Sequence, residues 1–426
     1  MKLLFRNAKI LTSARASVSE GEVHVSDGKI VYVGKPKEFA AERVVDCGGN
    51  LLIPGFANAH THSAMVLFRG LADDLPLQEW LHDRISPLEE HLTENDVYWG
   101  TMLAAAEYVR GGTTAIADMY YGEDAIISAV QQSGLAMGMW CGAADLSGGT
   151  EDALKHAEEY YLKFRENERI RYLLGVHSEY LASDALLYGM ADLAQTYGAP
   201  ATAHVSETLK ETGECTVRRN LTPVQFLCKI GFFDFGGVIA HGTYLEKEDV
   251  RLLAEKEVFC ASNPSSNLKL ASGIAPVYSM LQNGMKVCLG TDGAASNNAL
   301  SMFREMYLLS CLQKGVMKDA AAVSAEQAFA AATESGYRAL GLPGGTIERG
   351  NPADMVLLDL SAPNFRPENN LKKHIVYSAD NANVLMTVAN GKIVYNRGNY
   401  DIGEDIDAIY RNAERCIGRL KSKAGL

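Results

Sequence analysis

The centre of the chain repeats one pattern, in which a short apolar run ends in polar residues and a helical stretch follows. The runs are apolar throughout rather than alternating, which is typical of parallel strands that are buried on both faces. They cover Leu51–His62, Thr113–Met119, Ala136–Ala143, Arg171–Ser178, Pro200–Ser206, Gly237–Thr243, Val258–Asn263 and Lys286–Asp292. Eight strand–helix units predict an α/β fold, a (β/α)8 TIM barrel.

Both ends of the chain show the signals of short strands and hairpins. DGKIVYVG at 27–34 contains an Asp-Gly turn, and a similar segment, NGKIVYNRG, returns at 390–398. We therefore expect residues 1–53 and 345–400 to form a small composite β-sandwich domain, with the metal-dependent barrel at 54–344 as a continuous insertion. The remaining residues, 401–426, predict a C-terminal helix that packs on the outside.

The charge balance bears on the partners of this chain. It has 52 acidic and 40 basic side chains, a formal net charge of −12. Such a surface repels phosphate backbones and anionic lipids, which argues against binding to nucleic acid or membranes and favours a small-molecule substrate. The eight cysteines form no CxxC pair, which favours reduced thiols and a cytoplasmic protein. A homo-oligomer is left open, because barrels of this kind often self-associate.

Potential metal ligands gather at the ends of the expected strands. These groups are His60, His62, His177, His204, His241 and Asp292. Because the carboxyl ends of barrel strands share one mouth, their side chains should converge there. A histidine pair alone is equally well explained by ordinary packing, but the further groups at other strand ends favour a metal site.

The spacing of these groups suggests which of them bind. His60 and His62 stand at i and i+2, so both point to the same face of a strand. His204 and Asp292 would add a nitrogen and a carboxylate, a set that suits Zn²⁺ best, with Fe²⁺ and Mn²⁺ as alternatives. Strand four ends at His177 without a lysine that could bridge two ions. We therefore expect one divalent metal ion per chain.

Two further residues are candidates for proton transfer. Glu207 follows His204 by three residues; a glutamate there is usually a favourable charge at a helix N-terminus, but beside a metal it can carry protons. His241, seen alone, is more often a core histidine, but at a strand end it can orient water. We favour the functional interpretation of both.

Motifs for competing chemistries are absent from the sequence, which has no HExxH, no P-loop, no GxSxG and no GxGxxG after a strand. Two HxE matches lack the PCxxC of the cytidine-deaminase type. The segments present instead are PGFANAHTH (54–62), AHVSET (203–208), AHGTY (240–244), NPSSNLKLASG (263–273), GTDGAASNN (290–298) and GNPADMVLLD (350–359).

These segments, which span most of the chain, resemble the amidohydrolase superfamily, and within it the 5-methylthioadenosine/S-adenosylhomocysteine deaminase group. The resemblance implies a barrel with a composite β-sandwich and a mononuclear metal held by His60, His62, His204 and Asp292. It also implies hydrolytic deamination. Asp292 would take a proton from water, His241 would hold that water, and Glu207 would protonate the ring nitrogen beside the carbon that loses ammonia.

The resemblance also suggests substrate contacts. Trp80 would line a purine pocket, Glu89 would accept hydrogen bonds from ribose hydroxyls, and His177 would contact the substrate. A packed aromatic and an exposed helix charge are equally good explanations of the first two. Relatives that accept S-adenosylhomocysteine place arginines after strand three, whereas residues 141–153 contain none. An uncharged 5′-modified adenosine, such as 5′-methylthioadenosine or 5′-deoxyadenosine, fits better.

Three classes of function therefore compete. The preferred one is a deaminase of purine nucleosides such as 5′-methylthioadenosine, 5′-deoxyadenosine, adenosine or S-adenosylhomocysteine. The second is a related hydrolase of a free heterocycle, such as guanine, 8-oxoguanine, cytosine, a pterin or an s-triazine. The third is a non-catalytic scaffold, which the presence of every expected metal and proton-transfer residue disfavours.

Overall fold

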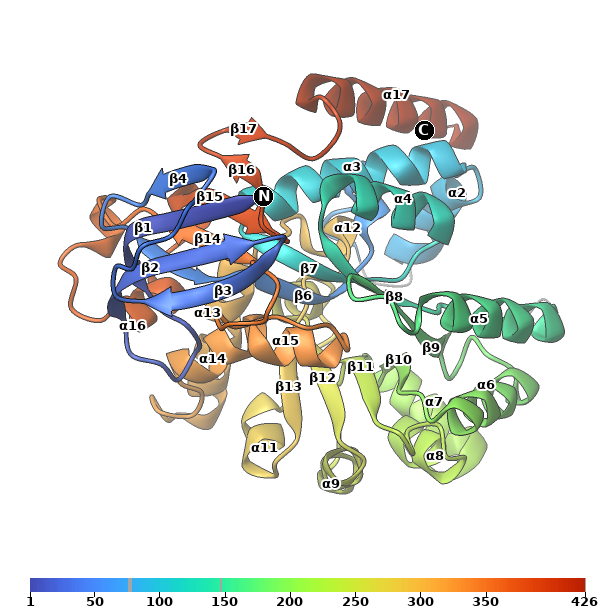
Figure 1. The fold of residues 1–426 in the computed structure, drawn as a ribbon. Coiled ribbons are helices and arrows are strands. Elements are labelled where there is room, and N and C mark those ends of the chain that lie inside the picture. Colours follow the sequence, from blue (N-terminus) through green and yellow to red (C-terminus); the bar gives the residue numbers. More distant parts are fainter. Residues whose placement is uncertain (76–78, 146–147, 426) are drawn as a thin grey trace.

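A parallel barrel forms the centre of the molecule, as Figure 1 shows for the computed structural model, which describes residues 1–75, 79–145 and 148–425. Its eight strands, all from the described residues, follow one another in sequence order around the sheet. They are β6 (Phe56–Thr61), β7 (Thr113–Asp118), β8 (Ala136–Trp140), β9 (Ile170–Ser178), β10 (Ala201–Val205), β11 (Gly237–His241), β12 (Val258–Ser262) and β13 (Lys286–Leu289). The predicted TIM barrel is confirmed.

Helices connect these strands and extend beyond the last one. The longer ones are α3 (Glu94–Arg110), α4 (Glu123–Ser133), α5 (Thr150–Phe164), α6 (Asp184–Tyr197), α7 (Leu209–Arg219), α8 (Pro223–Lys229), α9 (Lys247–Glu255), α13 (Met302–Met317), α14 (Ala325–Ala332), α16 (Leu371–Tyr377) and α17 (Ile406–Ala424). Shorter turns are η1 (Ser63–Phe68), η2 (Trp80–Ile85), α2 (Ser86–Glu89), α10 (Pro264–Lys269), α11 (Val277–Gln282), α12 (Ala294–Asn297), α15 (Glu334–Ala339), η3 (Pro363–Phe365) and η4 (Asn381–Asn383).

The first and last barrel strands meet through side chains and one backbone bond. The side-chain amide of Asn58 on β6 donates to Thr291 Oγ1 at 2.7 Å, and the Thr291 amide donates to Asn58 Oδ1 at 2.9 Å. One step further, the Asp292 amide donates to the carbonyl of His60 at 2.9 Å. The seam of the barrel therefore closes where two of the predicted metal ligands lie.

The apolar run Leu51–His62, counted from its hydropathy as one barrel strand although the domain boundary was expected at 53/54, is two strands. The structure divides it into β5 (Leu51–Pro54), which pairs with β14 (Met355–Leu358) in another sheet, and β6 of the barrel. Gly55 separates them, where any Cβ would collide with the side chain of Thr114. Both halves are fully buried, so their hydrophobicity carried no sign of the change of sheet.

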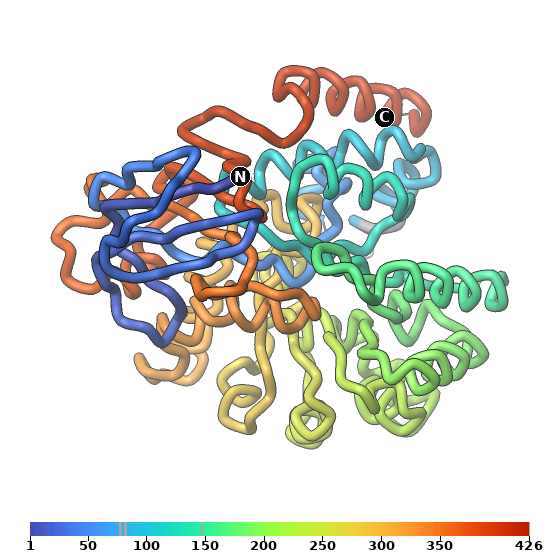
Figure 2. Tube along the Cα trace, in the orientation of Figure 1, coloured from blue at the N-terminus to red at the C-terminus, as the bar shows by residue number. Residues whose placement is uncertain are grey.

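The second sheet joins the two ends of the chain, as the blue and orange-red traces in Figure 2 show. Its path of strands is β17-β16-β15-β14-β5-β1-β2-β3, and β4 pairs with β1 beside that path. The remaining strands are β1 (Lys2–Ile10), β2 (Ser19–Ser26), β3 (Lys29–Gly34), β4 (Arg43–Asp46), β15 (Val384–Ala389), β16 (Lys392–Asn396) and β17 (Asn399–Tyr400). Among the described residues it is therefore one branched mixed sheet, whose two halves share a core.

The two similar hairpins meet in this sheet. The β2–β3 turn at Asp27-Gly28 and the β15–β16 turn at Asn390-Gly391 both use left-handed backbone. A Cβ on Gly28 would lie 2.9 Å from the carbonyl oxygen of Asn390, so the turns pack backbone to backbone.

At the chain end, α17 packs on α3 and α2, and Arg419 pairs with Asp96. In the described part of the chain, no helix combines the length and hydropathy of a membrane span.

Candidate functional site

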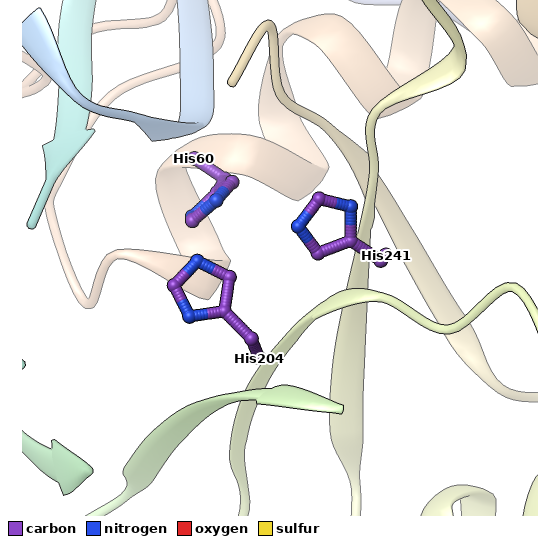
Figure 3. Close-up of side chains that lie close together, drawn as sticks. All are labelled: His60, His204 and His241. Carbon is purple, nitrogen blue, oxygen red and sulfur yellow. The ribbon is translucent and has the colours of Figure 1, made fainter. Parts of the chain in front are cut away.

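Three histidines from three strands face one another at the carboxyl end of the barrel (Figure 3). His60 is on β6, His204 on β10, and His241 is the last residue of β11. The ring centroid of His60 lies 4.8 Å from that of His204 and 5.5 Å from that of His241. All three are buried, and one nitrogen of each lies within 4.8 Å of the others. The structure thus brings these predicted site residues together.

A second group of potential ligands shares His60. Nε2 of His60 lies 3.7 Å and Nε2 of His62 lies 3.2 Å from Oδ1 of Asp292. Both ring nitrogens of His60 are buried and lack a hydrogen-bond partner within the residues described. Leaving polar atoms in that state costs free energy, which a bound cation would offset. These residues therefore fit a metal site, because nitrogen and carboxylate donors of this kind are those that bind Zn²⁺ and related ions.

Hydrogen bonds to the far side of each ring orient the other histidines. Nδ1 of His62 donates to the carbonyl of Met119 at 2.5 Å, and Nδ1 of His204 donates to the carbonyl of His177 at 2.8 Å. A carbonyl oxygen only accepts, so the proton of each neutral ring is on Nδ1 and Nε2 keeps its lone pair. Nδ1 of His241 makes a 2.8 Å hydrogen bond to Oδ1 of Asn267. Such bonds commonly orient ligating histidines and fix their tautomer.

Asp292 is held by three hydrogen bonds on a strained backbone. Its Oδ2 accepts from the hydroxyls of Ser266 at 2.6 Å and Ser296 at 3.0 Å, and its Oδ1 accepts from the Gly293 amide at 2.8 Å. The residue has a φ of 60°, a left-handed conformation that is costly outside glycine. The surrounding bonds maintain it, so the carboxylate has a defined position opposite His60 and His62.

The electrostatics of the cluster favour the neutral form of His60, His177 and His204 and, beside Asp292, the charged form of His62. Burial, reinforced by the neighbouring histidines, lowers the pKa of His60 and His204 well below the ordinary value. Burial also lowers the pKa of His177, to about 4. For His62 burial acts in the same sense and is the largest single effect, but the hydrogen bond to Asp292, the charges of Asp292 and Asp118 and the Met119 carbonyl together raise the pKa to about 9. Neutral imidazole is the form that coordinates a metal.

Glu207 lies beside the donor cluster rather than inside it. Its Oε2 is 3.8 Å from Nε2 of His241, and its Oε1 accepts from the hydroxyl of Ser272 at 3.4 Å. The carboxylate is 15% exposed, so a substrate in the mouth can reach it. Its position, close to an imidazole at the strand ends, is suited to proton transfer.

The three predicted substrate contacts are distributed around this cluster. The ring of His177 lies 4.6 Å from that of His204. Glu89 accepts a hydrogen bond from the hydroxyl of Tyr120 at 2.6 Å, and burial raises the pKa of its carboxyl. Trp80 is buried in an apolar cluster that includes Leu270. Trp80 and Glu89 lie in what the sequence suggests is a long loop after the first barrel strand, Leu75 to Leu92; the structure makes this segment helical at η2 and α2, and residues 76–78 lie outside the described residues.

Several supporting residues were not foreseen from the sequence. Ser266 and Asn267 lie on α10, which follows β12, whereas Asp292 follows β13. Tyr120 follows β7. The side chain of Glu179 is 1% exposed and pairs with Arg218 at 2.5 Å and with Arg219. No local pattern identifies such residues, because their partners are far away in sequence.

Comparison with known proteins identifies the family. The sequence profile of the amidohydrolase family matches residues 51–394. The chain belongs to the amidohydrolase family. This amidohydrolase is 41% identical over 399 residues to a 5-methylthioadenosine/S-adenosylhomocysteine deaminase of Thermococcus onnurineus, covering 92% of this chain and 94% of that one. It is 36% identical to the protein of the same name from Dictyoglomus thermophilum, covering 99% and 100%.

Solved structures agree with the architecture of this amidohydrolase. A crystal structure of an adenosine deaminase from Xanthomonas campestris with bound zinc has a TM-score of 0.94 and 32% identity, covering 99% of this chain and 98% of that one. A guanine deaminase from C. acetobutylicum shares the fold, with a TM-score of 0.82 and 22% identity over 93% of this chain and 100% of its own. The predicted membership in the superfamily is confirmed.

Proposed function

We propose that this amidohydrolase is a metal-dependent hydrolytic deaminase of purine nucleosides. The observation that carries the proposal is the pairing of a buried histidine–aspartate donor set with a separate carboxylate, Glu207, at the edge of the same mouth. Hydrolytic removal of an amino group needs an activated water and a group that moves protons, and these two features would supply them. The names of the relatives, deaminases of 5-methylthioadenosine, S-adenosylhomocysteine and adenosine, support the substrate class.

One divalent ion, zinc by preference, would be held by His60, His62, His204 and Asp292. Two observations within the described residues support this set: the ring nitrogens of His60 lack a partner, and His62 and His204 use Nδ1 for their backbone hydrogen bonds, so Nε2 of each ring is the atom that would bind the ion. The bound zinc of the Xanthomonas campestris structure supports the choice of ion. When bound, the ion makes hydroxide available at neutral pH by lowering the pKa of water to about 7.

The side chains around the ion would then move the protons. Asp292 would accept a proton from the attacking water, and His241, whose Nδ1 donates to Asn267, would hold the water by accepting a hydrogen bond at Nε2. Glu207 protonates the ring nitrogen beside the carbon that bears the amino group, which makes that carbon electrophilic. Asp292 would then pass the proton from water to the amino group, which leaves as ammonia, and the new hydroxyl would return a proton to Glu207 as the carbonyl forms. Positioned proton transfer of this kind contributes roughly 10²–10⁴-fold in rate.

The substrate is proposed to be a nucleoside with an uncharged 5′ group. Glu89 would accept hydrogen bonds from the ribose hydroxyls, while Trp80 and His177 would contact the base. Residues 141–153 contain no arginine, and two arginines of α7 are engaged by Glu179. An anionic amino-acid tail would therefore lack a free guanidinium from these segments. Cytoplasmic location and self-association stay predictions.

A substrate panel tests the proposal. Ammonia release is measured on 5′-methylthioadenosine, 5′-deoxyadenosine, adenosine and S-adenosylhomocysteine, against guanine, 8-oxoguanine, cytosine, a pterin and an s-triazine. The zinc-loaded enzyme should act on nucleosides, with the uncharged 5′ derivatives preferred over S-adenosylhomocysteine. Glu207→Gln, purified in parallel, controls for contaminating deaminases. Turnover of a free base alone would contradict the proposal.

A further inference from the structure

A buried glutamate accepts hydrogen bonds from the chain segment that carries Glu207. Oε1 of Glu211, on the first turn of α7, accepts from the Ser206 amide at 2.7 Å. Its Oε2 accepts from the Glu207 amide at 2.8 Å and from the Thr208 amide at 3.5 Å. Three successive backbone N–H groups therefore point at one carboxyl group, which is 6% exposed.

An ordinary helix cap does not account for these contacts. In a capping box the side chain at the third helical position accepts from the backbone amide of the N-cap residue. On α8 the corresponding bond, from the Thr222 amide to Gln225, is 3.2 Å long, and on α14 the bond to Gln327 is 2.9 Å. In α7 the bond to the N-cap residue is the longest of the three. The shorter two reach back to residues before the helix.

The carboxylate of Glu207 has little other support. Among the described residues, its side chain is held by the 3.4 Å hydrogen bond from Ser272 and the 3.8 Å approach to His241. Asp292, by contrast, receives three hydrogen bonds on its own carboxylate. The position of Glu207 therefore depends on its backbone, which follows Ser206 in a left-handed conformation with a φ of 54°.

Burying the carboxyl group of Glu211 beneath residues 206–208 costs free energy. Burial raises the pKa of its carboxyl to about 7, although three backbone amides oppose the rise. A glutamine or an apolar residue would avoid that burial of charge. A carboxyl group, however, offers acceptors on both oxygens, and amides that converge from one segment need both.

We infer that Glu211 is the positioning residue of the proton-transfer step: by binding the amides of 206–208 it sets the backbone from which Glu207 reaches the substrate. The inference rests on the proposed function for the role of Glu207. It goes beyond that proposal because Glu211 touches neither the substrate nor the metal donors. A displacement of about 1 Å in a catalytic group can cost roughly 10²-fold in rate, so the effect is measurable.

The test is Glu211→Gln in the zinc-loaded full chain. Glutamine keeps the size of the side chain but places an NH₂ group opposite a backbone N–H. Hydrogen–deuterium exchange of peptides covering 204–209 should accelerate about tenfold, the equivalent of one lost hydrogen bond. With 5′-methylthioadenosine, kcat should fall roughly 10–100-fold, while KM and zinc content stay within about twofold of the wild-type values.

Gln327→Ala is the matched control, because it removes a capping-box acceptor from a helix remote from Glu207. It should lower the thermal midpoint and leave kcat unchanged. Should Glu211→Gln fail to fold, Glu211→Asp, which keeps the charge but shortens its reach, should show the same loss of kcat. Unchanged exchange in 204–209, or a kcat that matches the control, would overturn the inference. If the wild type releases ammonia from no nucleoside, the proposed function fails, while the exchange result still decides the role of Glu211.

Discussion

The two sides of the barrel mouth are built differently. On the donor side, His62, His204 and Asp292 lie at or just beyond strand ends, and each is held by a hydrogen bond of 2.5–2.8 Å. The Glu89 side is a short helical segment outside the barrel, which ends at that residue. Its hydrogen bond in the structure is from Tyr120, which follows β7.

This contrast shows how one mouth can combine fixed chemistry with adjustable recognition. The hydrogen bonds between neighbouring strands fix the strand ends of the barrel, so side chains held there have little freedom to move. A helical segment inserted after a strand can change without disturbing that ladder. We expect variants on the donor side to affect metal content and kcat, and variants on the Glu89 side to affect mainly KM.

His204→Ala should have the largest effect. The variant should lose most of its zinc, and activity should fall roughly a thousandfold, because several kcal/mol of transition-state stabilisation depend on the bound ion. Metal analysis and ammonia release measure both. His177→Ala is the matched control, since its ring is a neighbour of His204 but its backbone carbonyl, which orients His204, remains. Full zinc content in His204→Ala would break the assignment of the donor side.

Glu207→Gln should come next. The amide cannot protonate the ring nitrogen, so kcat should fall roughly 10²–10⁴-fold. Zinc content should match that of the wild type, because Glu207 lies beside the donor set rather than in it. Combined metal and kinetic measurements separate it from His204→Ala. Loss of zinc together with kcat would place Glu207 among the ligands instead.

Glu305→Gln measures the free energy that is spent on holding the donor side in place. Glu305 binds the chain neighbours of Ser266 and Ser296, whose hydroxyls hold Asp292. Burial raises the pKa of Glu305 to about 7, and its carboxyl accepts from the Ser265 amide at 3.0 Å and from Asn297 at 2.9 Å. Because the folded state binds this proton more tightly than the unfolded chain does, stability from this group is lost as the pH rises from about 4.5 to about 7.

The free energy of unfolding of the wild type, relative to Glu305→Gln, should therefore fall across that range by up to about 3 kcal/mol. Urea unfolding at pH 5 and pH 7.5, with both proteins in the same zinc concentration, measures the difference. Comparing the two proteins at each pH cancels the shared effect of metal binding. A difference that does not vary with pH, or that rises, would contradict the argument.

Tyr120→Phe should have the smallest effect and should be confined to recognition. Without the phenolic hydroxyl, Glu89 loses a 2.6 Å hydrogen bond that holds it in place. KM for a nucleoside should rise roughly tenfold, as expected for a bond to a charged group, while kcat and zinc content change little. Tyr121→Phe is the control, because Tyr121 is 62% exposed and adjacent in sequence. A fall in kcat without a change in KM would assign Tyr120 to the donor side.

The sequence alone predicted the barrel and the positions of its potential ligands, because both depend on local order. A parallel strand buried on both faces leaves an uninterrupted apolar run. The residue that ends such a run must lie at the barrel mouth. His60, His204 and His241 were found in this way, without any knowledge of their neighbours.

Long-range contacts decided the rest. Gly55 stands where the chain passes from β5 to β6 within a single apolar run, and the approach of Thr114 leaves no room for a Cβ there. Glu211 looks like a helix-capping residue until the position of Ser206 is known. Tyr120 and Glu89 are 31 residues apart. Hydropathy and strand direction are encoded residue by residue, whereas a hydrogen bond between separate loops exists only once the folded backbone has brought its two groups together.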